Sequence, residues 1–279
     1  MIDGALLSVP LLFSSTLSVG LAVITWRMSD LRTKRSFICL LIANAWLSAT
    51  YLLELLSTNI QDMLFWNNME YISNVFIPPL FLLFTLRFVG RDSAVNRKNM
   101  AILFVVPTLA LVMLWTNDLH HSFYSTIALP PVLYMGTFVP IYGPWFYILT
   151  VYSFLMAAFS LYLLLNTFVR SSRYLRQKVT MVLASCTLPM FAFIVGLLKL
   201  TDLPFTFLMV LAFVGSMTLM FVGAYRYELF SIMPLALDTV VERMKDGVVV
   251  IDNRGHIIHI NPSAKRMLDT ARGGGEDRR

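Results

Sequence analysis

The chain has 279 residues, of which 57% are hydrophobic and only 14% are charged. Soluble domains carry about 25% charged residues, so the composition excludes an ordinary soluble domain and indicates a protein whose apolar surface faces a lipid bilayer. The net charge of +6 does not predict a nucleic-acid partner, because the basic residues stand in short segments beside apolar runs, where they act as topology signals.

Seven apolar segments follow one another within residues 1–231, and most of them contain the roughly 20 residues needed to cross a membrane. We predict spans at Leu6–Trp26, Phe37–Leu56, Trp66–Phe88, Met100–Trp115, Trp145–Val169, Val179–Leu198 and Pro204–Tyr225. The fourth is short, so it must stand nearly upright or use flanking residues. The predicted fold is an all-α membrane protein, a seven-transmembrane helix bundle.

The first apolar segment is not expected to be a cleavable signal peptide. Asp3 stands where a basic region would be, and no small-residue cleavage site closes the segment. Cys39 and Cys186 both fall inside apolar segments, where cysteine behaves as a small hydrophobic residue. A disulfide framework is therefore not expected.

The charges of the loops predict the direction of the helices. The first, third and fifth loops are basic, with Arg27, Arg32, Lys34, Arg35, Arg87, Arg91, Arg97, Lys98, Arg170, Arg173, Arg176 and Lys178. The second and fourth loops contain no Lys or Arg, and the sixth has only Lys199. Since positive residues stay on the cytoplasmic side, we expect the N-terminus outside and the C-terminus inside.

The fourth loop, Thr116–Pro144, is much longer than the others. Long loops are usually functional or disordered, and the apolar residues here argue for an ordered lid over the helix ends. Val132–Met135 and Thr137–Ile141 flank Gly136, which predicts a short hairpin. A plain connector is the alternative.

Polar and aromatic residues gather at the same level, where a polar stripe on a membrane helix must face the bundle or a water-filled cavity. We hypothesise an outward-opening ligand pocket lined by Glu54, Trp66, Asn67, Glu70, Tyr71, His120, His121, Tyr142 and Trp145. The alternatives are an aromatic belt and hydrogen bonds between helices. A metal site from Asp118, His120, His121 and a glutamate is disfavoured, because adjacent histidines diverge. We predict no metal or cofactor.

Pro78-Pro79 are expected to interrupt the third span near its middle, since each removes a helical hydrogen bond. Small residues on one side of the seventh span predict close helix packing; they include Ala212, Gly215, Ser216 and Gly223. Beyond it, residues 232–246 are predicted to form a signalling linker helix. Leu237, Val240, Val241 and Met244 give Leu235–Lys245 an apolar stripe, which predicts a homodimer or packing on the segment that follows.

Residues 247–270 have a soluble α/β pattern. Gly247–Ile251 and His256–Ile260 are predicted strands around an Asn253–Gly255 turn, and Asn261 is a predicted helix N-cap before Pro262. Two strands and a short helix do not fold stably alone, and residues 271–279 have no packing pattern. We therefore expect the sequence to be a fragment or a truncated reading frame.

Several motifs together resemble the seven-transmembrane input region of prokaryotic sensor histidine kinases over Leu6–Ser231. They are Trp66-Asn-Asn-Met-Glu-Tyr71 with Pro78-Pro79, Trp115-Thr-Asn-Asp-Leu-His-His-Ser-Phe-Tyr124, Tyr142-Gly-Pro-Trp-Phe146 and Arg173-Tyr-Leu-Arg-Gln177. Leu237–Leu268 resembles the start of a PAS domain, through Met244-Lys-Asp-Gly-Val-Val-Val-Ile-Asp252, Gly255-His-Ile and Asn261-Pro-Ser-Ala264.

The resemblance implies a sensory module of the prokaryotic plasma membrane. It would detect an extracellular or membrane-borne ligand and relay it through helix seven to a PAS domain and a downstream kinase or other output domain. No phosphoacceptor helix or nucleotide-binding segment of a kinase is present, so we do not expect an enzyme. The alternative is a small-molecule or ion transporter, suggested by Glu54, Glu70 and Arg87, although no internal repeat supports it. A retinal protein is disfavoured because Pro204–Tyr225 contains no lysine.

Overall fold

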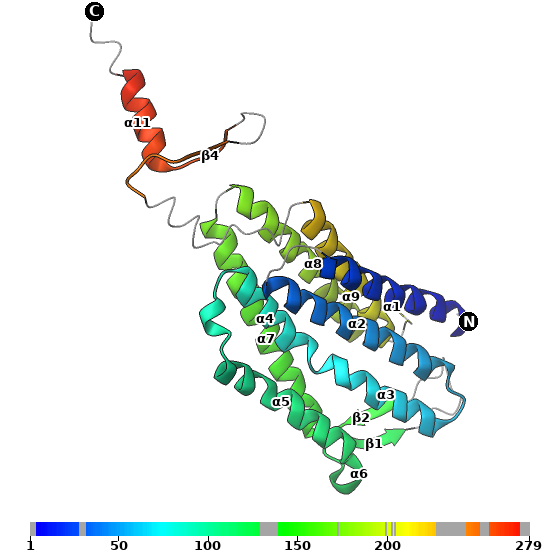
Figure 1. Cartoon of the computed structure of the whole chain (residues 1–279). Helices are drawn as coiled ribbons and strands as arrows, with labels where there is room; N and C mark the ends of the chain where they lie inside the picture. The colour runs from blue at the N-terminus through cyan, green and yellow to red at the C-terminus, as the bar shows by residue number, and fades with distance from the viewer. Residues whose placement is uncertain are drawn as a thin grey trace, which may run out of the picture. The chain divides into compact units, whose positions relative to one another are not determined.

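The computed structural model describes residues 4–27, 32–128, 139–171, 173–198, 200–201, 203, 205–226, 244–251 and 257–273. The chain divides into two compact units, Met1–Ser231 and Ile232–Arg279. The helices and strands of the first unit are α1 (Gly4–Arg27), α2 (Arg32–Leu56), α3 (Ile60–Asn74), α4 (Ile77–Phe88), η1 (Asp92–Ala94), α5 (Arg97–Trp115), α6 (Asn117–His120), β1 (Tyr124–Ala128), β2 (Val139–Tyr142), α7 (Pro144–Arg170), α8 (Arg173–Leu197) and α9 (Phe205–Arg226) (Figure 1).

Seven segments of the described residues are helical, long and apolar enough to cross a membrane, which confirms the predicted bundle. Two helices begin about six residues before their predicted starts. The third span begins at Ile60 because Asn59 caps α3, its side chain accepting from the Asp62 N–H at 2.8 Å. The sixth begins at Arg173, where polar residues extend α8 beyond its apolar part.

The third span consists of two helices, α3 and α4, that follow one another (Figure 1). α3 ends at Asn74, and α4 begins at Ile77 with Pro78 and Pro79 in its first turn. Proline has no N–H, and the first turn of a helix is where none is needed. The predicted interruption is thus confirmed, a few residues before the prolines themselves.

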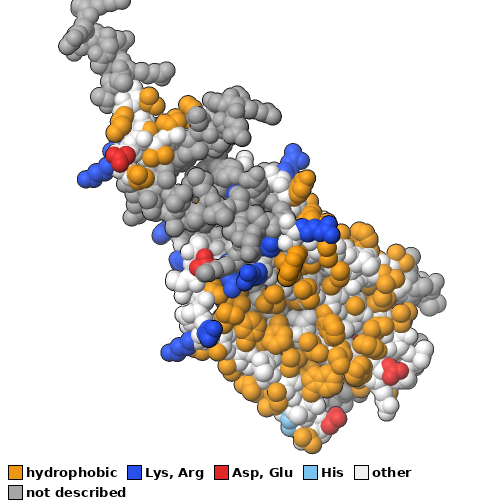
Figure 2. All heavy atoms as spheres, in the orientation of Figure 1, with side chains coloured by type: hydrophobic (Ala, Val, Ile, Leu, Met, Phe, Trp, Pro, Cys, Tyr) orange, Lys and Arg blue, Asp and Glu red, His pale blue; other side chains and the backbone are white. Residues whose placement is uncertain are grey.

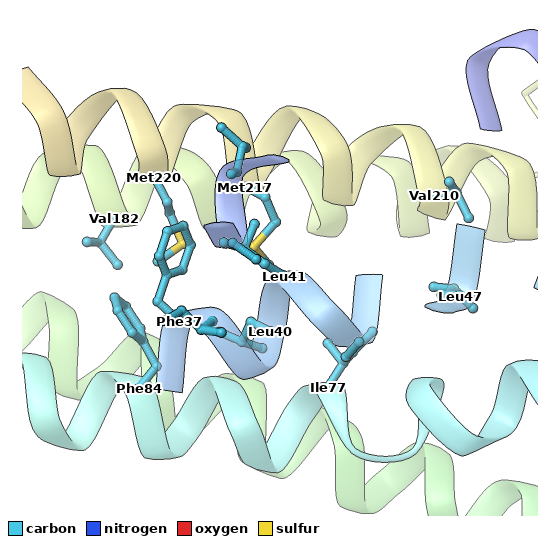
Figure 3. Close-up of a cluster of buried hydrophobic side chains, with 14 of the residues drawn as sticks. Phe37, Leu40, Leu41, Leu47, Ile77, Phe84, Val182, Val210, Met217 and Met220 are labelled. Atoms are coloured by element: carbon cyan, nitrogen blue, oxygen red, sulfur yellow. The ribbon is translucent and has the colours of Figure 1, made fainter. Parts of the chain in front are cut away.

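Helix α2 lies at the centre of the bundle. Of its apolar stretch 72% is buried, against 50% or less in every other span, and it packs against α1, α3, α4 and α9. Figure 3 shows its side chains between the two flanking helices: Phe37 and Leu41 lie between Phe84 of α4 and Met217 and Met220 of α9. A movement of α2 would therefore change the packing of most of the bundle.

The surface of the first unit is polarised. On the face that Figure 2 shows, hydrophobic side chains cover the side of the bundle, and Lys and Arg gather at the end opposite α6. Arg27, Arg87 and Arg170 mark this basic end, each in the last turn of its helix. The other end, where α6, β1 and β2 lie, is called the hairpin end below.

The predicted lid is an ordered hairpin with a different first strand. β1 and β2 pair antiparallel, with Tyr124 opposite Tyr142, and the register shifts between Tyr124 and Thr126. β2 overlaps the predicted strand Thr137–Ile141. The other predicted strand, Val132–Met135, lies outside the described residues, and the strand that pairs with β2 is β1.

The second unit contains β3 (Val249–Ile251), β4 (Ile257–Ile260) and α11 (Pro262–Gly273), with β3 and β4 antiparallel. The predicted strands and helix are present, and Asn261 caps α11 by accepting from the Ala264 N–H at 2.8 Å. The predicted turn Asn253–Gly255 lies outside the described residues. α11 continues to Gly273, into the predicted tail, whose residues 274–279 are also outside.

Most of the predicted 232–246 linker helix, residues 232–243, also lies outside the described residues. Its described end, Met244–Asp246, is not helical. The helix prediction is wrong there because side chains of the second unit bond this backbone: Ser263 Oγ donates to the Met244 carbonyl and Asn261 Nδ2 to the Asp246 carbonyl.

Candidate functional site

The hairpin end is organised by one buried asparagine. Asn117, at the start of α6, accepts from the backbone N–H groups of Phe123 and Tyr124 at 2.9 and 3.0 Å. Its Nδ2 donates to the Tyr124 carbonyl at 3.1 Å. An asparagine side chain carries both donor and acceptor, so it can replace a missing strand partner. Asn117 thereby fixes the entry of the chain into β1.

Gly143 allows the backbone at the end of β2 to lie close to the backbone of Ser122. The Gly143 N–H donates to the Phe123 carbonyl at 2.8 Å, and the Trp145 N–H donates to the Ser122 carbonyl at 3.0 Å. A Cβ added to Gly143 would collide with the Ser122 carbonyl. The end of β2 and the start of α7 are thus held against the residues that precede β1.

The two candidate histidines play local roles. His120 Nδ1 accepts from the Ser122 N–H at 3.0 Å, and Nε2 lies 3.1 Å from the Thr116 hydroxyl. His121 is exposed and adopts a left-handed conformation with φ 50°. Both ring nitrogens of His120 are thus occupied by neighbours in sequence. Within the described residues, no cluster of three or more His, Cys, Asp or Glu side chains is placed to hold a metal ion.

A hydrogen-bonded chain connects the hairpin to the centre of the bundle. The Tyr124 hydroxyl donates to Asn67 Oδ1 at 2.8 Å, and Asn67 Nδ2 donates to Glu54 Oε2 at 3.3 Å. The three residues come from β1, α3 and α2, in that order. This chain is called the Asn67 bridge below. It joins the part of the site outside the spans to the central helix.

Two carboxyl groups meet beneath the bridge. Glu54 of α2 and Glu70 of α3 are each 4% exposed, and their side chains are within hydrogen-bonding reach of one another. Glu70 Oε1 and the Tyr51 hydroxyl are buried and have no hydrogen-bond partner among the described residues. Tyr51 lies close enough to both glutamates to interact with them electrostatically. Buried polar groups normally have partners, so this cluster is unusual.

The hairpin tyrosines belong to the same electrostatic environment. Burial raises the pKa of the Tyr124 and Tyr142 phenols above its ordinary value, and the nearby Glu54 and Glu70 carboxyl groups act in the same direction. Both phenols are therefore neutral hydroxyl groups at physiological pH, and each can donate a hydrogen bond toward the helices.

Aromatic rings close the site from the side of α7. Tyr71 contacts Phe123 edge-on at 5.1 Å between ring centroids, and Tyr142 stacks on Phe146 at 3.6 Å. Trp145 packs against the same layer. Trp66 contacts the ring of Phe65 at 5.2 Å instead. Among the described residues, Trp66 forms no hydrogen bond with Glu54 or Glu70.

The structure thus brings together five of the nine predicted pocket residues, Glu54, Asn67, Glu70, Tyr71 and Tyr142, and places Trp145 beside them. His120, His121 and Trp66 take other positions. Sequence reasoning missed Tyr51 and Tyr124. Tyr51 precedes Glu54 by three residues, a spacing that puts both on one helix face and could have drawn attention to it. Tyr124 had no such signal, because a strand was not predicted there.

The family of the chain follows from a comparison with models of protein families. Residues 10–234 match the family described as the N-terminal 7TM region of histidine kinase. The chain belongs to this family. Residues 237–277 match a PAS domain. Searches of curated proteins and of solved structures gave no match.

The two matched ranges agree with the two compact units of the structure. A histidine kinase 7TM region joined to a PAS domain is a membrane sensory input module of a histidine kinase receptor, embedded in a lipid bilayer. The resemblance recognised in the sequence is confirmed.

Proposed function

We propose that the hairpin end of this input module faces the outside of a prokaryotic plasma membrane and receives the signal there. The basic loops support this orientation, because positive residues are retained in the cytoplasm. The basic end carries Arg27, Arg87 and Arg170, and the hairpin end carries the site. The chain itself acts by controlling an output domain rather than by catalysis.

The signal acts on the cluster around the Asn67 bridge. A ligand, extracellular or membrane-borne, that moves the hairpin must move Tyr124, and the bridge passes this displacement to Glu54 on α2. The observation that carries the proposal is this direct connection of a segment outside the membrane spans to the central helix. Buried polar groups inside a membrane bundle are costly, and their usual justification is function.

The signal leaves through α9. Along the interface between α2 and α9, Leu47 lies near Val210 and Leu41 near Met217 (Figure 3). α9 also packs closely on α8, since a Cβ on Gly215 would stand 3.0 Å from Leu188. A tightly packed interface shifts as a unit, so displacement of α2 moves α9. α9 precedes the residues that lead to the PAS domain.

We further propose that the module works as a homodimer through Leu235–Lys245, in which Leu237, Val240 and Val241, before the non-helical Met244, have the spacing of a helix stripe. Single cysteines at Val240, in a chain without its two natural cysteines, should give crosslinked dimers in membranes. A cysteine at Leu119, which is 85% exposed on α6, serves as the control that should not crosslink. Equal crosslinking at both positions would contradict the dimer.

The orientation has a direct test in intact cells. The Leu119 cysteine should react with a membrane-impermeant maleimide, and a cysteine at Val169, 69% exposed near the basic end, should react only after permeabilisation. The opposite pattern would overturn the proposed direction.

The signalling role is tested by joining residues 1–246 to a histidine kinase output with a phosphorylation readout. Asn67→Ala and Tyr124→Phe should each change the response to the external medium, because each removes a bond of the bridge. Asn74→Ala is the matched control on the same helix, since Asn74 is exposed. A response in the bridge variants equal to that of Asn74→Ala would contradict sensing at this cluster.

A further inference from the structure

The contact between Glu54 and Glu70 cannot form if both groups are charged and nothing lies between them. A carboxylate has only acceptor atoms, so two carboxylates within hydrogen-bonding reach cannot bond to each other without a proton between them. Like charges at such a distance, enclosed in an apolar bundle, also repel strongly. The contact therefore requires a positive partner.

The described part of the bundle offers no lysine or arginine for that purpose at this end, and of the two histidines there His120 bonds to Thr116 and Ser122 while His121 is exposed. Basic residues of the helices that pack around the pair lie at the basic end: Arg27 of α1, Lys34 and Arg35 of α2, Arg87 of α4, Arg97 and Lys98 of α5, and Arg226 of α9. The titratable groups that face the pair are tyrosines: Tyr51 from α2, Tyr71 from α3, Tyr124 from β1 and Tyr142 from β2. None of these can supply a positive charge.

We infer that Glu54 and Glu70 hold one proton between them and that this pair is a proton-binding site of the sensory module. The inference rests on the proposed function and deepens it, since it names the proton as the ligand of the hairpin end. A proton fits the geometry because it occupies no volume between two side chains that already reach each other.

The unpartnered Tyr51 hydroxyl completes the site. It is 1% exposed, lies beside both glutamates and donates to neither of them in the present arrangement. When the shared proton leaves to water, the pair becomes two carboxylates, and Glu70 Oε1, which already has no hydrogen-bond partner among the described residues, becomes part of a charged acceptor. A turn of Tyr51 toward that oxygen would then replace the Glu54–Glu70 contact between α2 and α3 by a Tyr51–Glu70 hydrogen bond between the same helices. Loss of one proton thereby changes the packing of the central helix.

The protein as it stands, residues 1–279 in phosphatidylcholine nanodiscs, allows a direct measurement by infrared spectroscopy. At neutral pH the wild type should show the carbonyl stretching band of a protonated carboxyl group, shifted in D2O. Glu54→Gln and Glu70→Gln should each lose this band, because the glutamine amide donates the hydrogen bond that the proton provides. Asp62→Asn, at an exposed carboxyl on α3, should keep it.

Three outcomes overturn the inference. The wild type could lack the band, which means that both groups are ionised. It could lack the band and contain a stoichiometric metal ion by elemental analysis, which means that an inorganic cation neutralises the pair. The band could persist in both single variants, which means that the proton is not shared. Because the measurement uses no signalling readout, its result is independent of the phosphorylation experiment that tests the proposed function.

Discussion

Replacement of Asn117 by alanine should loosen the hairpin without unfolding the bundle. The asparagine makes three bonds to the backbone of Phe123 and Tyr124, and it is 9% exposed. A typical buried hydrogen bond contributes about 1 kcal/mol, so loss of all three should destabilise the hairpin by about 3 kcal/mol. At 1.4 kcal/mol for each factor of ten, local opening becomes roughly 100-fold more frequent. Asn117→Asp keeps the acceptor oxygen but turns its second oxygen toward the Tyr124 carbonyl, so it should restore only part of the lost stability.

Hydrogen exchange followed by mass spectrometry measures this opening, because amides exchange through local unfolding. Amides of residues 123–128 should exchange faster in Asn117→Ala, and those of α2 should not change. Asp118→Ala, at the exposed neighbouring position, is the matched control. The reasoning is refuted if Asn117→Ala and Asp118→Ala give the same exchange in β1.

Three further variants test other parts of the chain. Gly143→Ala should destabilise the protein in thermal denaturation by about 1–3 kcal/mol through its collision with the Ser122 carbonyl, whereas Gly20→Ala, with nothing within 4 Å, should be tolerated. Phe37→Ala should cost about 3–5 kcal/mol, because Phe37 has no exposed surface; equal loss in a lipid-facing control such as Phe13→Ala would contradict the central role of α2. Asn261→Ala removes three bonds and should speed amide exchange at residues 246–248; unchanged exchange there would refute its role.

Hydrophobicity and charge were sufficient to predict the bundle. A helix that crosses lipid must satisfy its own backbone, so a long apolar segment has few other structures available. The first residues of the helices were harder to predict. α3 begins at Ile60 because of the Asn59 cap, and α8 includes the polar residues that start at Arg173. Apolar periodicity does not report such polar turns.

The candidate site was predicted as a region rather than as a set of contacts. Glu54, Glu70 and Asn67 were recognisable because polar groups in apolar segments stand out. The second strand of the hairpin was predicted, but its partner β1 at Tyr124–Ala128 was not. Strand pairing depends on a partner distant in sequence, and the side chain of Asn117 that fixes β1 acts across six and seven residues.

The sequence by itself determined the membrane environment, the number of spans, the interruption before Pro78 and the family, because each follows from local composition or from short motifs. Only the tertiary structure decided that α2 is central, that Tyr124 reaches Asn67, and that Glu54 and Glu70 meet without a basic partner among the described residues. These facts depend on which helix faces which. In a bundle whose helices are apolar on nearly every side, the sequence pattern contains little information about that choice.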